Sequence, residues 1–311
     1  MQTGTRTHRS DDRKGRTMSG TVADEIRERL GDLSPAERKV ARVLLAGYPA
    51  AVFETVAIIA ERASVSAPTV LRCAARLGYK SFPDLQAALR AELDARTASP
   101  LTLYESSQSA QQQSAPPPAG SDDAVLPGVG NLETLQHAVS KTFKEVSSHD
   151  FDKAVELLSD NRRRIYLVGG RFTRLLGEYL GLHLTQLRHQ VALLPDKDVE
   201  RAATLAQLAR RDVTVVFDYR RYEEDKTIIA ELARERGGKV IVFTDPWLSP
   251  ATAYADVVLT SQVASDSPYD SLTPTLALVE SLIAGVLDRL GPDAHLRMQE
   301  AEAAARRLGL L

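Results

Sequence analysis

A stretch of small and polar residues divides this chain, and it constrains the fold more than any other feature. Residues 106–130 read SSQSAQQQSAPPPAGSDDAVLPGVG and contain almost no large apolar side chains. Such a segment cannot bury enough apolar surface to offset the entropy lost on ordering it. We therefore expect two separately folded domains joined by a flexible linker over residues 99–131.

Composition narrows the classes of protein to which the chain can belong. Its 311 residues, 43% apolar and 26% charged, are typical of a soluble globular protein. The single cysteine, Cys73, excludes an intramolecular disulfide and a multi-cysteine metal site, and the six histidines show no metal-binding spacing. A net charge of −2 gives no overall attraction to polyanions, so any nucleic acid must bind at a local basic patch.

Targeting signals are also missing from the pattern. No apolar run approaches the roughly 20 residues that span a bilayer. Residues 1–20 carry charges and no apolar segment, so we expect a disordered arm there. The prediction is a cytoplasmic protein without a membrane partner, a cofactor or a metal.

Before the linker the pattern predicts short helices. The segment SPAERKVARVLL (34–45) begins with Ser34 as N-cap, Pro35 at the first helical position and Glu37 three residues after the cap, which is a capping box. A second helix is expected over 55–63. A third, capped by Ser66, should end at Gly78. Two short helices joined by a tight turn predict a helix-turn-helix within residues 21–98.

The third helix has two different faces. The apolar side chains of Val70, Cys73, Ala74 and Leu77 recur at helical spacing and should face the other helices, which puts Thr69, Arg72 and Arg76 on the opposite stripe. From Arg62 to Pro83 there are four basic residues and no acidic one. This pattern is compatible with a helix that reads the DNA major groove and with an ordinary solvated helix.

The longer motif is more specific. LSPAERKVARVLL followed by IIAERASVSAPTVLRCAARLGYKSFPDLQ resembles the N-terminal domain of the RpiR (MurR/RpiR) family of bacterial transcriptional regulators, over residues 25–95. The resemblance implies DNA contacts from the third helix and the residues around it. The implied contact residues are Ser66, Ala67, Pro68, Thr69, Arg72 and Arg76, with Lys80 reaching a phosphate.

After the linker, short apolar strands alternate with helical segments. The strands are RRIYLVGG, QVALLP, DVTVVF, KVIVFT and DVVLT. This alternation predicts an α/β domain with a five-stranded parallel sheet of the flavodoxin-like kind and helices on both faces. We expect it to span residues 132–292, followed by a helical tail over 293–311.

The first strand feeds a glycine turn, VGGRFTR (168–174), of the type that binds ligands in parallel α/β sheets. A third glycine and a Walker-type lysine are both absent, which argues against a dinucleotide and a nucleoside triphosphate. The order of strands and the segment FTDPWLSPATAYADVVL resemble instead the sugar isomerase (SIS) domain of the RpiR family, over residues 130–290.

The chain departs from that family pattern at two turns. The family usually has G-x-G-x-S in the first turn and S-x-S-G after the third strand. Here Arg171 replaces the second glycine, and Asp218-Tyr219-Arg220-Arg221 replaces the serine loop. The predicted ligand-binding residues are Gly169, Gly170, Arg171, Thr173, Asp218, Arg220 and Arg221.

Two interpretations of these arginines remain open. Arg220 and Arg221 can clamp a carboxylate or phosphate in place of the missing serines. Alternatively, Asp218, Glu223, Glu224 and Arg171 form an internal network with these two arginines that closes the old pocket.

For function, we expect a bacterial DNA-binding transcriptional regulator whose SIS domain senses a small anionic metabolite or sugar derivative. The partners are double-stranded operator DNA, the effector and a second copy of the chain, as a homodimer or tetramer. Two alternatives compete with it, a sugar isomerase-like enzyme and a ligand-free dimerisation module. An isomerase needs a positioned base and acid, and we predict no catalytic residue, although Asp270 and Glu280 follow the last strand.

Overall fold

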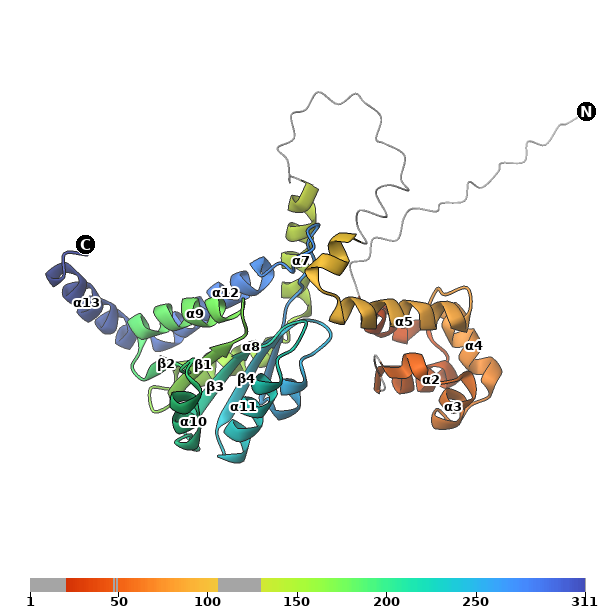
Figure 1. Ribbon diagram of the computed structural model, residues 1–311, viewed down its shortest axis with the longest axis horizontal. Helices are drawn as coiled ribbons and strands as arrows, with labels where there is room; N and C mark the ends of the chain where they lie inside the picture. Colours follow the sequence, from red (N-terminus) through yellow and green to blue (C-terminus); the bar gives the residue numbers. More distant parts are fainter. Residues whose placement is uncertain (1–20, 47, 49, 106–129, 311) are drawn as a thin grey trace, which may run out of the picture. The chain divides into compact units, whose positions relative to one another are not determined.

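The computed structural model describes residues 21–46, 48, 50–105 and 130–310, and it divides the chain into two compact units, Met1–Leu89 and Arg90–Leu311 (Figure 1). The predicted N-terminal arm and most of the predicted linker lie outside the described residues. Residues 100–105 are helical, although they belong to the predicted linker. Each unit is described by itself below.

The first unit is made of helices. They are α1 (Val22–Arg29), η1 (Leu30–Asp32), α2 (Pro35–Ala46), η2 (Ala50–Phe53), α3 (Val56–Arg62), α4 (Ala67–Arg76) and the start of α5 (Phe82–Thr97). The predicted capping box is present, since the Ser34 N–H donates to Glu37 Oε2 at 2.8 Å and the Glu37 N–H donates to Ser34 Oγ at 3.4 Å. The helices enclose a small core of Val40, Leu44, Ile59, Val70, Cys73 and Leu77.

A tight turn joins α3 to α4. Ser64 adopts a φ of 52°, and the Val65 N–H donates to the Ala60 carbonyl at 2.9 Å, which closes the end of α3. At the other end of α4, Gly78 has a φ of 91°, and the Tyr79 N–H donates to the Ala74 carbonyl at 3.0 Å. The helix-turn-helix is therefore formed where the sequence predicts it.

The second unit contains a five-stranded parallel sheet in the order β2-β1-β3-β4-β5, as predicted. The strands are β1 (Arg164–Gly169), β2 (Val191–Leu193), β3 (Asp212–Phe217), β4 (Lys239–Thr244) and β5 (Val257–Thr260). Every residue of the central strand β3 is buried. This explains why residues 213–217 form an apolar run that only Thr214 interrupts.

Helices cover both faces of the sheet (Figure 1). They are α7 (Gly130–Glu145), α8 (Ser148–Ser159), α9 (Arg174–Leu187), α10 (Asp198–Ala206), α11 (Glu224–Glu235), η3 (Pro250–Tyr254), α12 (Thr273–Leu290) and α13 (Pro292–Arg307). One core lies under α8, α9 and α12, and the other lies under α11 and η3. Among the described helices, none combines the length and the apolar character needed to cross a membrane.

The sheet register decides where a ligand site can form. Gly169, the last residue of β1, pairs with Phe217, the last residue of β3. The turn after β1 and the loop after β3 therefore leave the sheet side by side at its carboxyl edge, which is where ligands bind in parallel α/β folds.

Candidate functional site

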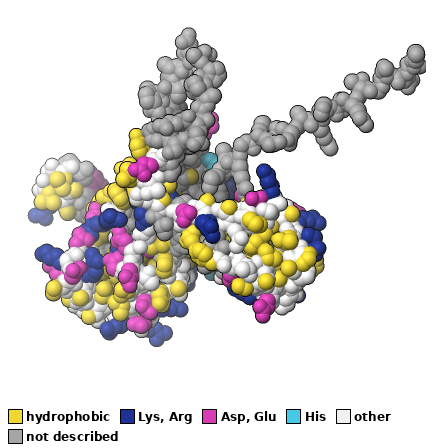
Figure 2. Space-filling model, turned by 45° about the vertical axis from the view of Figure 1, so that its right-hand side comes forward, with side chains coloured by type: hydrophobic (Ala, Val, Ile, Leu, Met, Phe, Trp, Pro, Cys, Tyr) yellow, Lys and Arg dark blue, Asp and Glu magenta, His cyan; other side chains and the backbone are white. Residues whose placement is uncertain are grey.

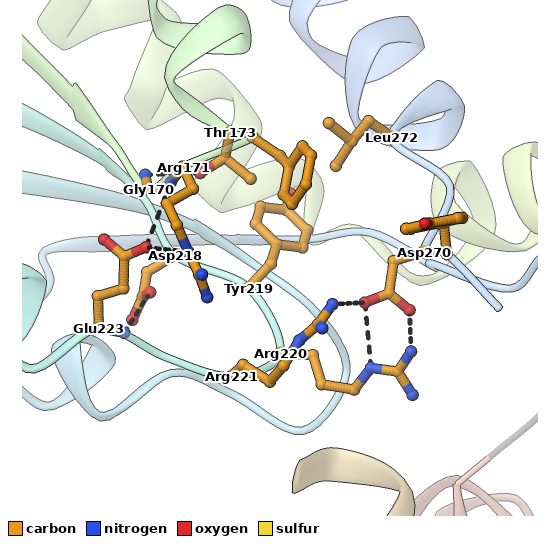
Figure 3. A pocket seen from close by; sticks show the side chains of 12 residues that line it. Gly170, Arg171, Thr173, Asp218, Tyr219, Arg220, Arg221, Glu223, Asp270 and Leu272 are labelled. Carbon is orange, nitrogen blue, oxygen red and sulfur yellow. Dashed lines mark hydrogen bonds and ion pairs between the residues drawn. The ribbon is translucent and has the colours of Figure 1, made fainter. Parts of the chain in front are cut away.

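A cavity of about 240 Å³ opens at this carboxyl edge (Figure 3). It is lined by residues 170–173 after β1, by the loop after β3 and by Tyr269, Asp270 and Leu272 before α12. Six of the seven predicted ligand residues line it: Gly170, Arg171, Thr173, Asp218, Arg220 and Arg221. Gly169 does not, because it ends β1 beneath the turn.

The turn after β1 is tightly built. A Cβ at Gly169 would lie 2.6 Å from the Thr173 carbonyl oxygen, so this position needs glycine. The Thr173 hydroxyl accepts from the Gly170 N–H at 2.8 Å and donates to the Phe217 carbonyl at 2.9 Å. Because the hydroxyl proton is used in the hydrogen bond to Phe217, Thr173 cannot donate a hydrogen bond to a ligand. Its two hydrogen bonds instead hold the turn after β1 against the end of β3.

Arg220 is already engaged in an ion pair. Its Nε donates to Asp270 Oδ2 at 3.1 Å, and its Nη2 donates to the other carboxylate oxygen. The guanidinium also lies 5.7 Å from the ring centroid of Trp247, and its side chain is only 9% exposed. Arg220 is thus ion-paired, but with Asp270 and not with the acidic residues of its own loop that the ion-pair interpretation named.

Arg171 and Arg221 are held more loosely. Arg171 Nε lies 3.8 Å from Glu223 Oε1, with the side chain 79% exposed. Arg221 Nη2 lies 4.0 Å from Asp270 Oδ2, with the side chain 27% exposed. Both guanidinium groups belong to the lining of the cavity (Figure 3).

Asp218 lies at the base of the loop and is 2% exposed. Ser249 Oγ donates to one carboxylate oxygen, and the Glu223 N–H donates to the other at 3.2 Å. Burial raises the pKa of Asp218 to about 6, although these hydrogen bonds and the charge of Lys226 oppose the shift. This carboxylate anchors the loop more than it faces a ligand.

The Tyr219 hydroxyl belongs to a buried cluster of three hydroxyl groups. The Tyr219 hydroxyl lies 2.8 Å from Ser261 Oγ and 2.9 Å from Thr275 Oγ1, and these two oxygens are 2.7 Å apart. Burial raises the pKa of the Tyr219 phenol, so it stays protonated. The cluster joins the loop after β3 to β5 and α12 and makes it rigid.

Sequence reasoning missed several lining residues. Phe172, Tyr269 and Leu272 give the cavity an apolar and aromatic side. No apolar periodicity marks them, because residues 269 and 272 lie in the irregular segment between β5 and α12. Asp270 and Glu223, the counter-ions of the arginines, were not predicted as ligand-site residues. Asp270 was named only as a possible catalytic residue, and Glu223 only as a member of an ion-pair network.

Neither Asp270 nor Glu280, the two carboxylates noted after the last strand, is free to act as an acid or base in the cavity. Asp270 is tied to Arg220, and Glu280 Oε1 accepts from the Tyr179 hydroxyl at 3.1 Å, outside the lining. No group of three metal-binding side chains occurs within the part of the chain that the structure describes.

On the first unit, α4 presents most of the predicted DNA-contacting residues to solvent. Ser66, Ala67, Pro68, Arg72, Arg76 and Lys80 are exposed. Thr69 is not, because it turns toward the core and is only 5% exposed, so its placement on the outer stripe was wrong.

Thr69 instead supports its neighbours on α4. Its Oγ1 accepts from Arg72 Nη2 at 3.0 Å and lies 3.0 Å from Ser66 Oγ. Thr69 thereby orients Arg72 without facing the solvent itself.

Comparison with known proteins agrees with this description. Residues 20–96 match the model of the helix-turn-helix domain of the rpiR family, and residues 157–285 match the SIS domain. The chain belongs to the RpiR family of transcriptional regulators. The predicted family, fold class and regulatory function are thus confirmed.

Relatives of this RpiR-family regulator span almost its whole length. The HTH-type transcriptional regulator HexR of Pseudomonas aeruginosa is 28% identical over 286 residues, which cover 89% of this chain and 93% of HexR. HexR of Escherichia coli is 24% identical over 294 residues, which cover 92% of this chain and 95% of that protein.

Two solved structures show the same fold. The sugar isomerase domain of an RpiR transcription factor from Sphaerobacter thermophilus has a TM-score of 0.53 and 24% identity, and covers 57% of this chain and 98% of that one. NanR of Vibrio vulnificus, solved as a complex with ManNAc-6P, has a TM-score of 0.52 and 18% identity, and covers 93% of this chain and 99% of its own.

Proposed function

We propose that this regulator binds operator DNA through α4 and that a small anionic sugar derivative in the SIS cavity controls that binding. The protein acts in the cytoplasm as a homodimer, or as a tetramer of two dimers, and performs no catalysis. The observation that carries the proposal is the pair of loosely held arginines, Arg171 and Arg221, in a cavity at the carboxyl edge of the sheet.

The DNA-binding half rests on the surface of α4. Arg72 and Arg76 lie one turn apart on the exposed side of the helix, and Lys80 follows just beyond it. Arginine can donate two hydrogen bonds to guanine in the major groove, and lysine pairs with phosphate. A helix-turn-helix places its second helix in that groove, so these charges supply the local attraction that the net charge of −2 does not.

The ligand-binding half rests on the mixture of groups around the cavity. Arg171 and Arg221 can bind a phosphate or carboxylate, and the exposed rings of Phe172 and Tyr269 offer surfaces against which a sugar ring can pack. NanR, which shares the fold, was solved with a sugar phosphate. A sugar carrying one anionic group matches this combination of charge and aromatic surface.

Assembly into dimers is supported by apolar side chains that remain exposed on the SIS unit. Leu182 on α9 is 66% exposed, Leu287 on α12 is 36% exposed and Leu296 on α13 is 57% exposed. Figure 2 shows hydrophobic side chains interspersed with charged ones over the visible surface. Because α9 packs against both α12 and α13, these leucines can contribute to one surface for association with a second copy.

A ligand-free dimerisation module is the second candidate, and a specific observation favours it. Three arginines and three carboxylates line the cavity: Arg171, Arg220, Arg221, Asp218, Glu223 and Asp270. Their formal charges cancel, so an anion is not attracted by net charge. It can bind only if Arg171 and Arg221 exchange their long contacts with carboxylates for shorter ones with the ligand.

Thermal melting of the full chain distinguishes the two candidates. Phosphosugars, sugar acids and dicarboxylates are added in turn, and a ligand at 100 times its Kd should stabilise the fold by about 2.7 kcal/mol. The variant R171A/R221A should keep the fold and lose the shift. The matched control is R210A/R211A, which removes two exposed arginines just before β3, at the opposite end of that strand.

The control should respond to the ligand as the wild type does. If no anion raises the melting temperature of the wild type, the proposed ligand binding is wrong and the SIS domain is a ligand-free dimerisation module.

A further inference from the structure

Leu71 is a large apolar side chain on the exposed face of α4, and it is 49% exposed. It lies directly before Arg72. The other large apolar residues of this helix and its C-cap, Val70 and Leu77, are each 1% exposed. Leu71 is therefore not part of the core of the first unit.

The exposed and buried residues of α4 separate cleanly. Successive residues are about 100° apart around a helix, so Ala67, Leu71 and Ala75 form one exposed row and Pro68, Arg72 and Arg76 form the next. Thr69, Val70, Cys73 and Ala74 fill the buried half. The outer surface thus has an apolar row centred on Leu71 beside a basic row centred on Arg72.

The basic row determines which way this surface faces in a complex with DNA. If Arg72 and Arg76 reach base edges, the adjacent row enters the same groove. Ala67 and Ala75 are short, so Leu71 is the side chain of that row that extends furthest. It has no hydrogen-bonding atom, and the one apolar group that a base presents in the major groove is the C5-methyl of thymine.

We propose that Leu71 is a specificity-determining residue that packs against a thymine methyl group next to the base read by Arg72. This inference rests on the proposed binding of DNA through α4. It implies that each operator half-site carries a thymine beside a position contacted by an arginine, and that replacing this thymine lowers the affinity without any loss of hydrogen bonds.

Deoxyuridine tests the contact directly, because it differs from thymidine by the methyl group alone. A high-affinity duplex is first selected from a random pool with the wild-type protein. Each thymine of a half-site is then replaced by deoxyuridine, and the affinity is measured by fluorescence anisotropy. At one position the wild type should bind about fourfold more weakly, the factor expected for one methyl-sized group no longer buried.

Variants at position 71 are then tested with the same thymine and deoxyuridine duplexes. L71A and L71Q should bind the thymine duplex more weakly than the wild type does and should be insensitive to deoxyuridine. V199A, which truncates an exposed valine on α10, should retain the wild-type sensitivity. Circular dichroism and thermal melting check that the variants are folded, and L71Q serves as the second variant should L71A be unstable.

The other outcomes are separable. A wild type that binds tightly but ignores every deoxyuridine, or an L71A that stays as sensitive as the wild type, would overturn the role of Leu71 while leaving operator binding intact. A variant that loses dimerisation in sedimentation would assign Leu71 to a protein contact instead. Failure of the wild type to select any duplex would overturn the DNA-binding proposal as well.

Discussion

Arg220 and Asp270 form a two-pronged ion pair across the SIS cavity, although they are 50 residues apart in the chain. The pair joins the loop after β3 to the segment before α12. Both side chains are largely buried, at 9% and 16% exposure. Removing one partner would leave the other charge largely buried and deprived of this two-pronged contact.

We therefore expect a specific pattern of stabilities. R220A and D270A should each lower the free energy of unfolding by about 3 kcal/mol, whereas R220M/D270L should lose clearly less than the sum. R221A is the matched control, because Arg221 lies 4.0 Å from the same carboxylate and should cost less than about 1 kcal/mol. Urea denaturation measures all four, and additive losses would contradict the pairing.

Two buried threonines should respond in opposite ways to the same substitution. Within the described residues, the Thr214 hydroxyl on β3 is buried and has no hydrogen-bond partner, whereas the Thr173 hydroxyl makes two bonds. T214V should stabilise the protein by about 1 kcal/mol, since it removes an unsatisfied polar group. T173V should destabilise it by about 2 kcal/mol, because the Gly170 N–H and the Phe217 carbonyl lose their partner. Thermal melts that move in the same direction would show that one hydrogen-bond assignment is wrong.

Asp218 should make stability depend on pH. Its pKa of about 6 in the folded state lies above the value of 3.8 for the unconstrained side chain, so the folded protein binds the extra proton. Stability contributed by this group should therefore rise as the pH falls from about 7 to 4, by at most about 3 kcal/mol. Lys226 and Glu223 also face this carboxylate: the charge of Lys226 lowers the pKa of Asp218, and the charge of Glu223 raises it.

D218N identifies the source of the pH dependence. Unfolding is measured in urea between pH 4 and 8, and the variant should lose the rise seen in the wild type. A wild type that becomes steadily less stable from pH 7 to 4, with D218N following the same curve, would contradict the assignment to Asp218.

The fold was predictable because it depends on periodic patterns. The apolar run of β3 and the capping box at Ser34 and Glu37 each determine a local structure, and a parallel sheet follows from the alternation of strands with helices. The turn after β1 was predictable too, since Gly169 has no room for a side chain.

The partners of the charged residues were not predictable to the same degree. Arg220 and Asp270 are in contact only because the segment after β5 passes beside the loop after β3. No local sequence pattern predicts this long-range contact. Thr69 was misplaced for a related reason. Its hydroxyl is polar, which favours the outer stripe, but it lies inside because Arg72 and Ser66 supply its hydrogen-bond partners.

The central claim is that this regulator reads DNA with the exposed arginines of α4. The most direct test is fluorescence anisotropy with a duplex selected by the wild-type protein, at several salt concentrations. R72A/R76A should lose roughly 2 to 6 kcal/mol of binding free energy. The melting temperature should stay close to that of the wild type, because both side chains are exposed and Thr69 keeps Ser66 as a hydrogen-bond partner when Arg72 is removed. R306A/R307A removes the same charge from exposed positions at the end of α13 and should bind like the wild type. Equal affinity of R72A/R76A and the wild type for that duplex would contradict the account.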